Sequence, residues 1–140
     1  MIQRIQTLYL LFAGIFVFLS LGYSIFGPFD IYGVLYADRL EFVNYIIKVL
    51  LGLTGVLSLY DIFLYKNRIK QIKVAGIAML STFVAYVIVV IMLFIKTIKW
   101  DNVATIILML LPLVSLLMIQ YARKAIAKDE NLVRAADRIR

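Results

Sequence analysis

Two charged residues, Lys48 and Asp61, interrupt a stretch that is otherwise apolar enough to cross a bilayer. They stand 13 residues apart, which is about 20 Å along a helix that rises about 1.5 Å per residue. Side chains on a helix lean toward its N-terminus, so Lys48 reaches the nearer surface with its long stem, whereas Asp61 leans toward the centre of the bilayer. Asp61 therefore needs a chemical partner inside the hydrocarbon.

Two kinds of chemistry would satisfy Asp61. We favour an ion pair with Arg4, at the start of the first span, which would pin two helix ends together; Lys73, Arg123 and Lys124 lie at similar depth. The alternative is a proton or cation site, because acids inside membranes often mark ion pathways. A relay would require a second acid on a neighbouring span, and the sequence offers none, so we place the structural pin above the ion site.

The chain contains no Cys and no His. This excludes disulfides, thiolate nucleophiles, Cys/His zinc sites, imidazole haem ligands and Ser-His-Asp catalysis. The sequence therefore predicts no catalytic, cofactor-binding or metal-binding residue, and we expect the protein not to be an enzyme.

The elements that must position Asp61 are helices. Hydrophobic types make up 64% of the 140 residues, against roughly 45–50% in soluble domains, and a transmembrane helix needs about 20 mainly apolar residues. The sequence predicts an all-α membrane protein in one domain, 1–140, folded as an antiparallel bundle of four transmembrane helices. The predicted spans are 5–26, 43–65, 72–95 and 103–122. The segment between the first two, 27–42, is read as an interfacial loop, with a ligand-capping flap as the alternative.

The distribution of Lys and Arg along the chain predicts its orientation in the membrane. The formal net charge is +7, but no basic segment is interleaved with stacking aromatics, so we expect no nucleic acid partner. Eleven basic residues fall on the side of both termini: Arg4, Lys66, Arg68, Lys70, Lys73, Arg123, Lys124, Lys128, Arg134, Arg138 and Arg140. Only Arg39, Lys96 and Lys99 fall on the other side. The positive-inside rule then places both termini in the cytoplasm.

Small residues mark the faces on which helices pack in lipid. The third span carries Ala75, Ala78, Thr82 and Ala85 on one seam; the second offers Gly52, Gly55 and Ser58, and the first Ala13, Ser20 and Gly27. We favour internal packing of these seams over contact with a partner. Pro112 predicts a kink in the fourth helix, with Ser115 and Thr105 available to cover the freed backbone groups.

The C-terminal segment, 123–140, has apolar residues at helical spacing. It predicts a cytoplasmic amphipathic helix that either continues the fourth span or lies on the inner leaflet. Glu130 and Arg134 form a favourable i,i+4 pair. The predicted contacts with a partner or with lipid are Arg123, Lys124, Lys128, Arg134, Arg138 and Arg140.

Both ends of the chain carry a family resemblance. The motifs are residues 1–7 at the start and 128–130, 132–134 and 136–140 at the end. Together with the span pattern, they resemble a family of small four-span inner-membrane proteins of Bacteroidota that is known only as a domain of unknown function. The resemblance implies four helices in a bacterial inner membrane and supplies no activity, cofactor or site residue.

Three functions remain open. The first is a non-enzymatic accessory or scaffolding subunit of a larger membrane complex, with membrane lipids and other integral membrane subunits as partners and a homo-oligomer as one possible form. The second is a small ion- or proton-linked transporter or channel that acts as an oligomer. The third, a membrane enzyme that modifies lipid, is disfavoured because the sequence has neither clustered carboxylates nor a phosphate-binding motif.

Overall fold

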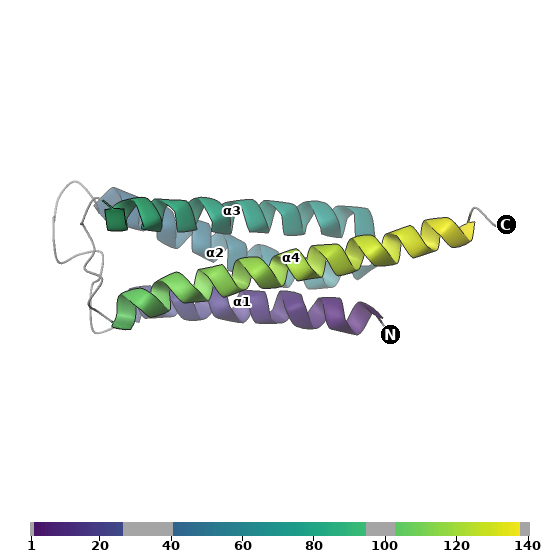
Figure 1. The fold of residues 1–140 in the computed structure, drawn as a ribbon, viewed down its shortest axis with the longest axis horizontal. Coiled ribbons are helices and arrows are strands. Elements are labelled where there is room, and N and C mark those ends of the chain that lie inside the picture. Colours follow the sequence, from purple (N-terminus) through teal and green to yellow (C-terminus); the bar gives the residue numbers. More distant parts are fainter. Residues whose placement is uncertain (1, 27–40, 95–102, 138–140) are drawn as a thin grey trace.

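The computed structural model describes residues 2–26, 41–94 and 103–137 and shows four long helices (Figure 1). These are α1 (Ile2–Phe26), α2 (Glu41–Phe63), α3 (Arg68–Phe94) and α4 (Val103–Asp137), with a short 3₁₀ turn, η1 (Leu64–Lys66), between α2 and α3. The described part of the chain contains no strand. The predicted all-helical fold is therefore confirmed, whereas the predictions for Gly27, most of the 27–42 loop, Arg138 and Arg140 lie outside the described residues.

The link between α2 and α3 is very short. Only η1 and Asn67 separate the two helices, and the Asn67 N–H donates to the Leu64 carbonyl at 2.8 Å. The Gln71 N–H donates to the Asn67 carbonyl at 3.0 Å and closes the first turn of α3. Helix α3 thus begins four residues before the predicted span at 72, because Arg, Lys and Gln favour helix and continue it into the basic turn.

The four helices pack around one interior through a seven-residue repeat. Most of the buried positions in the described residues alternate at spacings of four and three: residues 6, 10, 13, 17 and 20 on α1; 47, 51, 54, 58 and 61 on α2; 71, 75, 78, 82, 85, 89 and 92 on α3; and 112, 115, 119, 122 and 126 on α4. This spacing is typical of helix bundles with interlocking side chains. Helix α1 packs against α2 and α4, and α3 packs against the same two helices.

The predicted small-residue seams face this interior. Ala75, Ala78, Thr82 and Ala85 are buried, as are Ala13 and Ser20 on α1 and Gly55 and Ser58 on α2; Gly52 is half-buried. Internal packing therefore uses all the described seams.

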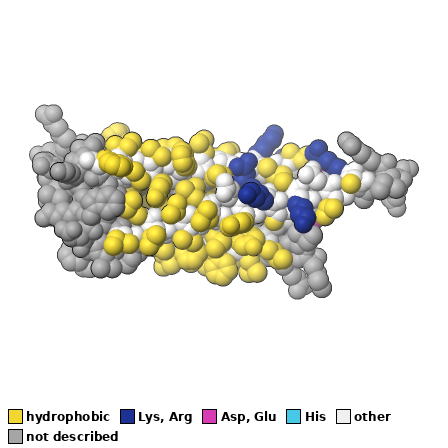
Figure 2. Space-filling model, in the orientation of Figure 1, with side chains coloured by type: hydrophobic (Ala, Val, Ile, Leu, Met, Phe, Trp, Pro, Cys, Tyr) yellow, Lys and Arg dark blue, Asp and Glu magenta, His cyan; other side chains and the backbone are white. Residues whose placement is uncertain are grey.

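The outer surface is apolar, and the interior is unusually polar. Thirteen hydrophobic and nine polar or charged residues are buried in the described part of the chain, while large hydrophobic side chains are exposed along every helix. Figure 2 shows these side chains covering most of the described bundle, with Lys and Arg gathered toward one end. All four helices are long and apolar enough to cross a membrane.

We call the end where Lys and Arg gather the basic end. It holds the start of α1, the η1 turn, the start of α3 and the late part of α4 (Figure 1). There α4 continues as one unbroken helix beyond its neighbours. Of the two predicted forms of the C-terminal helix, the structure thus shows the one that continues the fourth span.

Candidate functional site

A stripe of three polar residues, Thr54, Ser58 and Asp61, runs along the buried face of α2 toward the basic end. All three are fully buried. Their spacings of four and three continue the stripe that Ile47 and Leu51 begin, so the same packing that buries the two apolar residues also buries the polar ones. The interior thus changes from apolar to polar along one helix face.

Thr54, farthest from the basic end, is well satisfied. Its hydroxyl donates to the Leu50 carbonyl at 2.9 Å and forms a hydrogen bond with the Ser81 hydroxyl of α3. The Thr82 hydroxyl lies 3.0 Å from the Thr54 oxygen and 2.8 Å from the Ala78 carbonyl. This cluster of three hydroxyls joins α2 to α3 in the interior.

Asp61, nearest the basic end, is not satisfied. Its side chain is fully buried, and neither carboxylate oxygen has a hydrogen-bond partner among the described residues. The main chain of Asp61, by contrast, has a partner: Gln71 Nε2 donates to its carbonyl at 3.1 Å. Gln71 therefore satisfies one of the last carbonyl groups of α2, which a helix end leaves without an intrahelical donor.

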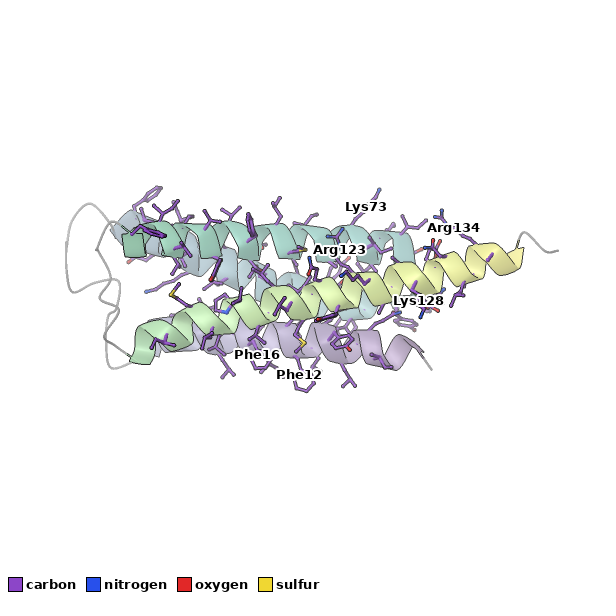
Figure 3. All side chains as sticks on the ribbon, viewed as in Figure 1. Phe12, Phe16, Lys73, Arg123, Lys128 and Arg134 are labelled. Atoms are coloured by element: carbon purple, nitrogen blue, oxygen red, sulfur yellow. The ribbon has the colours of Figure 1, made fainter. Side chains whose placement is uncertain are left out.

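Of the cationic residues predicted as partners of Asp61, the structure describes the side chains of Lys73, Arg123 and Lys124. The side chain of Arg4 lies outside the described residues, so the Asp61–Arg4 pair stays a prediction. Lys73 and Lys124 are exposed, and Figure 3 shows Lys73 pointing away from the bundle.

Arg123 packs along the α3–α4 seam. Its guanidinium carbon is 3.7 Å from the point that a Cβ on Gly76 would occupy, and Nη1 lies 3.5 Å from the Met79 sulfur. Its Nε is buried and has no partner in the described part of the chain. The guanidinium of Arg123 lies against α3, where Gly76 leaves room for it, and the predicted contact of Arg123 with a partner or with lipid stays a prediction.

Two ion pairs organise the late part of α4. Arg68 Nη2 lies 3.1 Å from Asp129 Oδ2, and the two side chains are 22% and 15% exposed. Arg68 Nη1 also donates to the Asp129 main-chain carbonyl at 3.4 Å. On α4 itself, Arg134 Nε donates to Glu130 Oε1 at 2.9 Å, so the i,i+4 pair predicted from the sequence is present.

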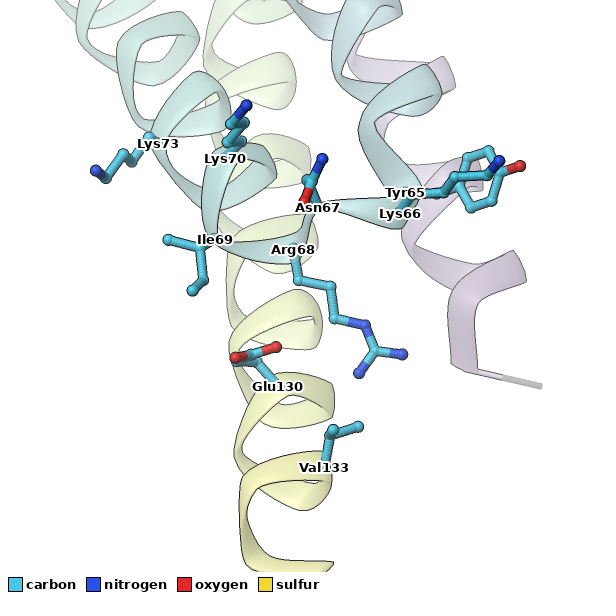
Figure 4. A pocket seen from close by; sticks show the side chains of 9 residues that line it. All are labelled: Tyr65, Lys66, Asn67, Arg68, Ile69, Lys70, Lys73, Glu130 and Val133. Atoms are coloured by element: carbon cyan, nitrogen blue, oxygen red, sulfur yellow. The ribbon is translucent and has the colours of Figure 1, made fainter. Parts of the chain in front are cut away.

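A groove of about 780 Å³ opens between the α2–α3 link and α4. Figure 4 shows Arg68 extending from the start of α3 alongside α4 beside this groove, with Lys70 and Lys73 extending in other directions. Lys66, Lys70 and Lys73 are exposed and have no acidic partner among the described residues. The basic end therefore presents three uncompensated ammonium groups around the groove.

The remaining predicted contact residues lie on the surface of α4 or beyond the described residues. Lys124, Lys128 and Arg134 are exposed, and no described residue of another helix pairs with them. Leu132 and Val133 are exposed beside them. This part of α4 thus offers a mixed basic and apolar surface.

Pro112 is buried inside α4 without ending the helix. Ser115 is one of the two residues available to cover the backbone groups freed by this proline. Instead its hydroxyl donates to the Ala13 carbonyl of α1 at 3.1 Å. Ser115 therefore joins two helices, and Thr105 lies outside the described side chains.

Several of these residues were not singled out from the sequence. Ser81, Gln71, Arg68 and Asp129 carry the contacts just described, yet each is an ordinary residue in its own helix. For Gln71 a signal was available in its spacing, because it falls on the same seven-residue repeat as the alanine seam of α3.

A protein-family model matches nearly the whole chain. The family model described as "Domain of unknown function (DUF4293)" matches residues 2–139. No curated protein and no solved structure matches the chain.

Proposed function

The chain belongs to the DUF4293 family, whose description names no activity, and from that premise we propose that it is a non-enzymatic accessory or scaffolding subunit of a larger membrane complex. In this proposal the protein is an integral protein of a bacterial inner membrane. It forms an antiparallel four-helix bundle with both termini in the cytoplasm.

The surface chemistry supports the membrane placement. Exposed Leu, Ile, Val and Phe side chains surround the helices, while hydroxyl groups bond across the interior. Helices in lipid associate through small residues and interhelical hydrogen bonds because lipid tails are as apolar as leucine. The basic end then faces the cytoplasm, where the positive-inside rule places lysine and arginine.

One observation carries the accessory role: α4 extends past the rest of the bundle. We call residues 127–137 the α4 arm (Figure 1). Arg68 and Asp129 attach its base to α3, whereas Lys128, Leu132 and Val133 are exposed on it. A helix that is held at its base and unpartnered along its apolar residues is suited to dock a second protein at the membrane surface.

A single-cysteine series tests the topology cleanly, because the chain has no native cysteine. We expect Asn67→Cys and Lys128→Cys to react with a membrane-impermeant maleimide in inverted vesicles and not in intact cells. Asp38→Cys is expected to show the opposite pattern. Labelling of positions 38 and 128 from the same side would contradict the proposed topology.

Purification of the tagged protein in a mild detergent tests the accessory role. We expect a companion membrane protein in fixed stoichiometry, and we expect the double variant Lys128→Gln/Leu132→Gln to lose it. The control variant Lys70→Gln/Lys73→Gln removes two exposed lysines outside the arm and should retain the companion. A monomer without a stoichiometric companion, or equal recovery with the arm variant, would refute docking through the arm.

A further inference from the structure

We propose that Asp61 is the anionic ligand of a small-cation site inside the bundle, occupied by a proton or by a monovalent metal cation. The inference rests on the membrane placement proposed above and is independent of the accessory role.

The first support is the isolation of the carboxylate. The Asp61 side chain is fully buried, and both of its oxygens lack a hydrogen-bond partner among the described residues. An ionised carboxylate removed from water without a compensating charge costs several kcal/mol. A positive charge bound at the carboxylate removes this cost.

The second support is the set of polar atoms at the same end of the interior. The Ser58 hydroxyl, one turn before Asp61 on the same face of α2, is fully buried and has no partner in the described part of the chain. Gln6 Nε2, on the buried face of α1, is also unpartnered there. Farther from the basic end, Thr54, Ser81 and Thr82 satisfy one another on α2 and α3, whereas the Ser20 hydroxyl of α1 is also buried and unpartnered in the described part of the chain. The unsatisfied groups of the α2 stripe thus lie on the Asp61 side of the hydroxyl cluster.

The third support comes from the charged groups on the helices that pack against α2. On α3, Arg68 pairs with Asp129, Lys73 is exposed, and Gln71 is uncharged and bonded to the main chain. On α1, Gln6 is uncharged, and the side chain of Arg4 lies outside the described residues.

On α4, which packs against α1 and α3, Arg123 lies against Gly76 and Met79, and Lys124 is exposed. Among the described side chains, none supplies the charge that Asp61 requires.

The ligand class follows from the donors. The Asp61 carboxylate supplies a single negative charge, which a proton or an alkali-metal ion neutralises. A divalent ion such as Ca²⁺ takes six to eight oxygen ligands, commonly with several carboxylates. The described residues contain no group of three or more acidic, His or Cys side chains that could hold such an ion.

Labelling with dicyclohexylcarbodiimide tests the site. This apolar reagent adds to the protonated form of a carboxyl group that is shielded from water, and mass spectrometry locates the adduct. The full-length protein is reconstituted in liposomes and labelled across a pH series, with and without NaCl or KCl, and with choline chloride as the control salt. We expect labelling at Asp61 that rises as pH falls and is lost in Asp61→Asn. Asp129→Asn, which removes an ion-paired carboxylate, should leave the Asp61 adduct unchanged.

Comparison of labelling in NaCl, KCl and choline chloride identifies the cation that occupies the site. Protection of Asp61 by sodium or potassium but not by choline indicates a monovalent metal cation; pH-dependent labelling without protection indicates a proton. The absence of labelling in the wild-type protein at every pH would overturn the proposal. Labelling that appears only in Arg4→Gln would also overturn it, because Arg4 would then be the counter-charge. The maleimide series reports membrane placement independently, so failure of the two proposals can be distinguished.

Discussion

Thr54 shows how single polar side chains determine helix contacts in this interior. Its hydroxyl bonds within its own helix to the Leu50 carbonyl and across to Ser81 of α3. In an apolar surrounding an unmet hydroxyl is costly, so this group holds two helices in one register. Its methyl group adds only packing.

We therefore expect Thr54→Val to destabilise the bundle more than Thr54→Ser. The valine variant keeps the shape but removes the hydroxyl that Ser81 and Thr82 share, and interhelical hydrogen bonds in membranes average about 0.6 kcal/mol, with values up to about 1.7. The serine variant keeps the hydroxyl and loses one methyl group. Thermal unfolding in detergent, followed by circular dichroism, measures the difference. Equal melting temperatures for the two variants would show that the hydroxyl cluster contributes nothing.

For single residues, the sequence identified Asp61 as unusual but did not predict which polar side chains meet in the interior. Asp61 stood out because a carboxylate inside an apolar span is rare. The hydroxyl cluster did not, because Ser and Thr are common in transmembrane helices and only the relative rotation of α2 and α3 shows which of them meet. The partner predicted for Asp61, Arg4, stays a prediction.

At the scale of elements, Gly55 lets α1 and α2 pack closely together. A Cβ added at this position would lie 2.7 Å from Cζ of the Phe18 ring on α1. The ring therefore occupies the space that glycine leaves, and α1 approaches α2 closely there. At Gly22 on α1, by contrast, an added Cβ would meet no atom within 4 Å.

The contrast between Gly55 and Gly22 predicts that substitution of glycine by alanine has different effects on stability at the two positions. Gly55→Ala should lower stability by about 1–3 kcal/mol, because added volume in a packed contact forces side chains to shift. Gly22→Ala should leave stability unchanged or raise it by up to about 1 kcal/mol, because alanine favours helix over glycine. Denaturation in mixed micelles provides the comparison. A Gly55→Ala protein as stable as Gly22→Ala would mean that Phe18 swings outward without cost.

The helices were the most predictable elements. Long uncharged runs and the seven-residue spacing of small residues are local properties of the sequence, and each of the helices α1–α4 overlaps one predicted span. The form of the C-terminal segment was left open because its residues suit both a continued helix and a surface helix. Ile126, fully buried, and Asp129, paired with Arg68, favour continuation, and the Arg68–Asp129 pair depends on where α3 begins.

On the scale of the whole molecule, the direction of the α4 arm depends on a contact near its base. Arg68 reaches Asp129 from the first residue of α3, so the turn between α2 and α3 is coupled to the arm. The pair is partly exposed, and such pairs contribute at most about 1 kcal/mol. Its main effect is therefore on the orientation of the arm and only slightly on overall stability.

Arg68→Gln should accordingly loosen the arm without unfolding the bundle. We expect faster trypsin cleavage after Lys128 and Arg134 in reconstituted protein and a nearly unchanged melting temperature. Glu130→Gln is the matched control, since it removes a pair within α4 and leaves the contact with α3 intact. The charge exchange Arg68→Asp/Asp129→Arg should restore protection. Unchanged cleavage in Arg68→Gln would show that other contacts hold the arm.

The length of α4 gives the molecule a fixed height. Its 35 residues extend about 52 Å at about 1.5 Å per residue, whereas the hydrocarbon core of a bilayer is about 30 Å thick. In the membrane placement proposed here, α4 therefore extends about 20 Å beyond the hydrocarbon as one continuous helix. The length of α4 would hold a protein docked on the arm at a set distance above the lipid.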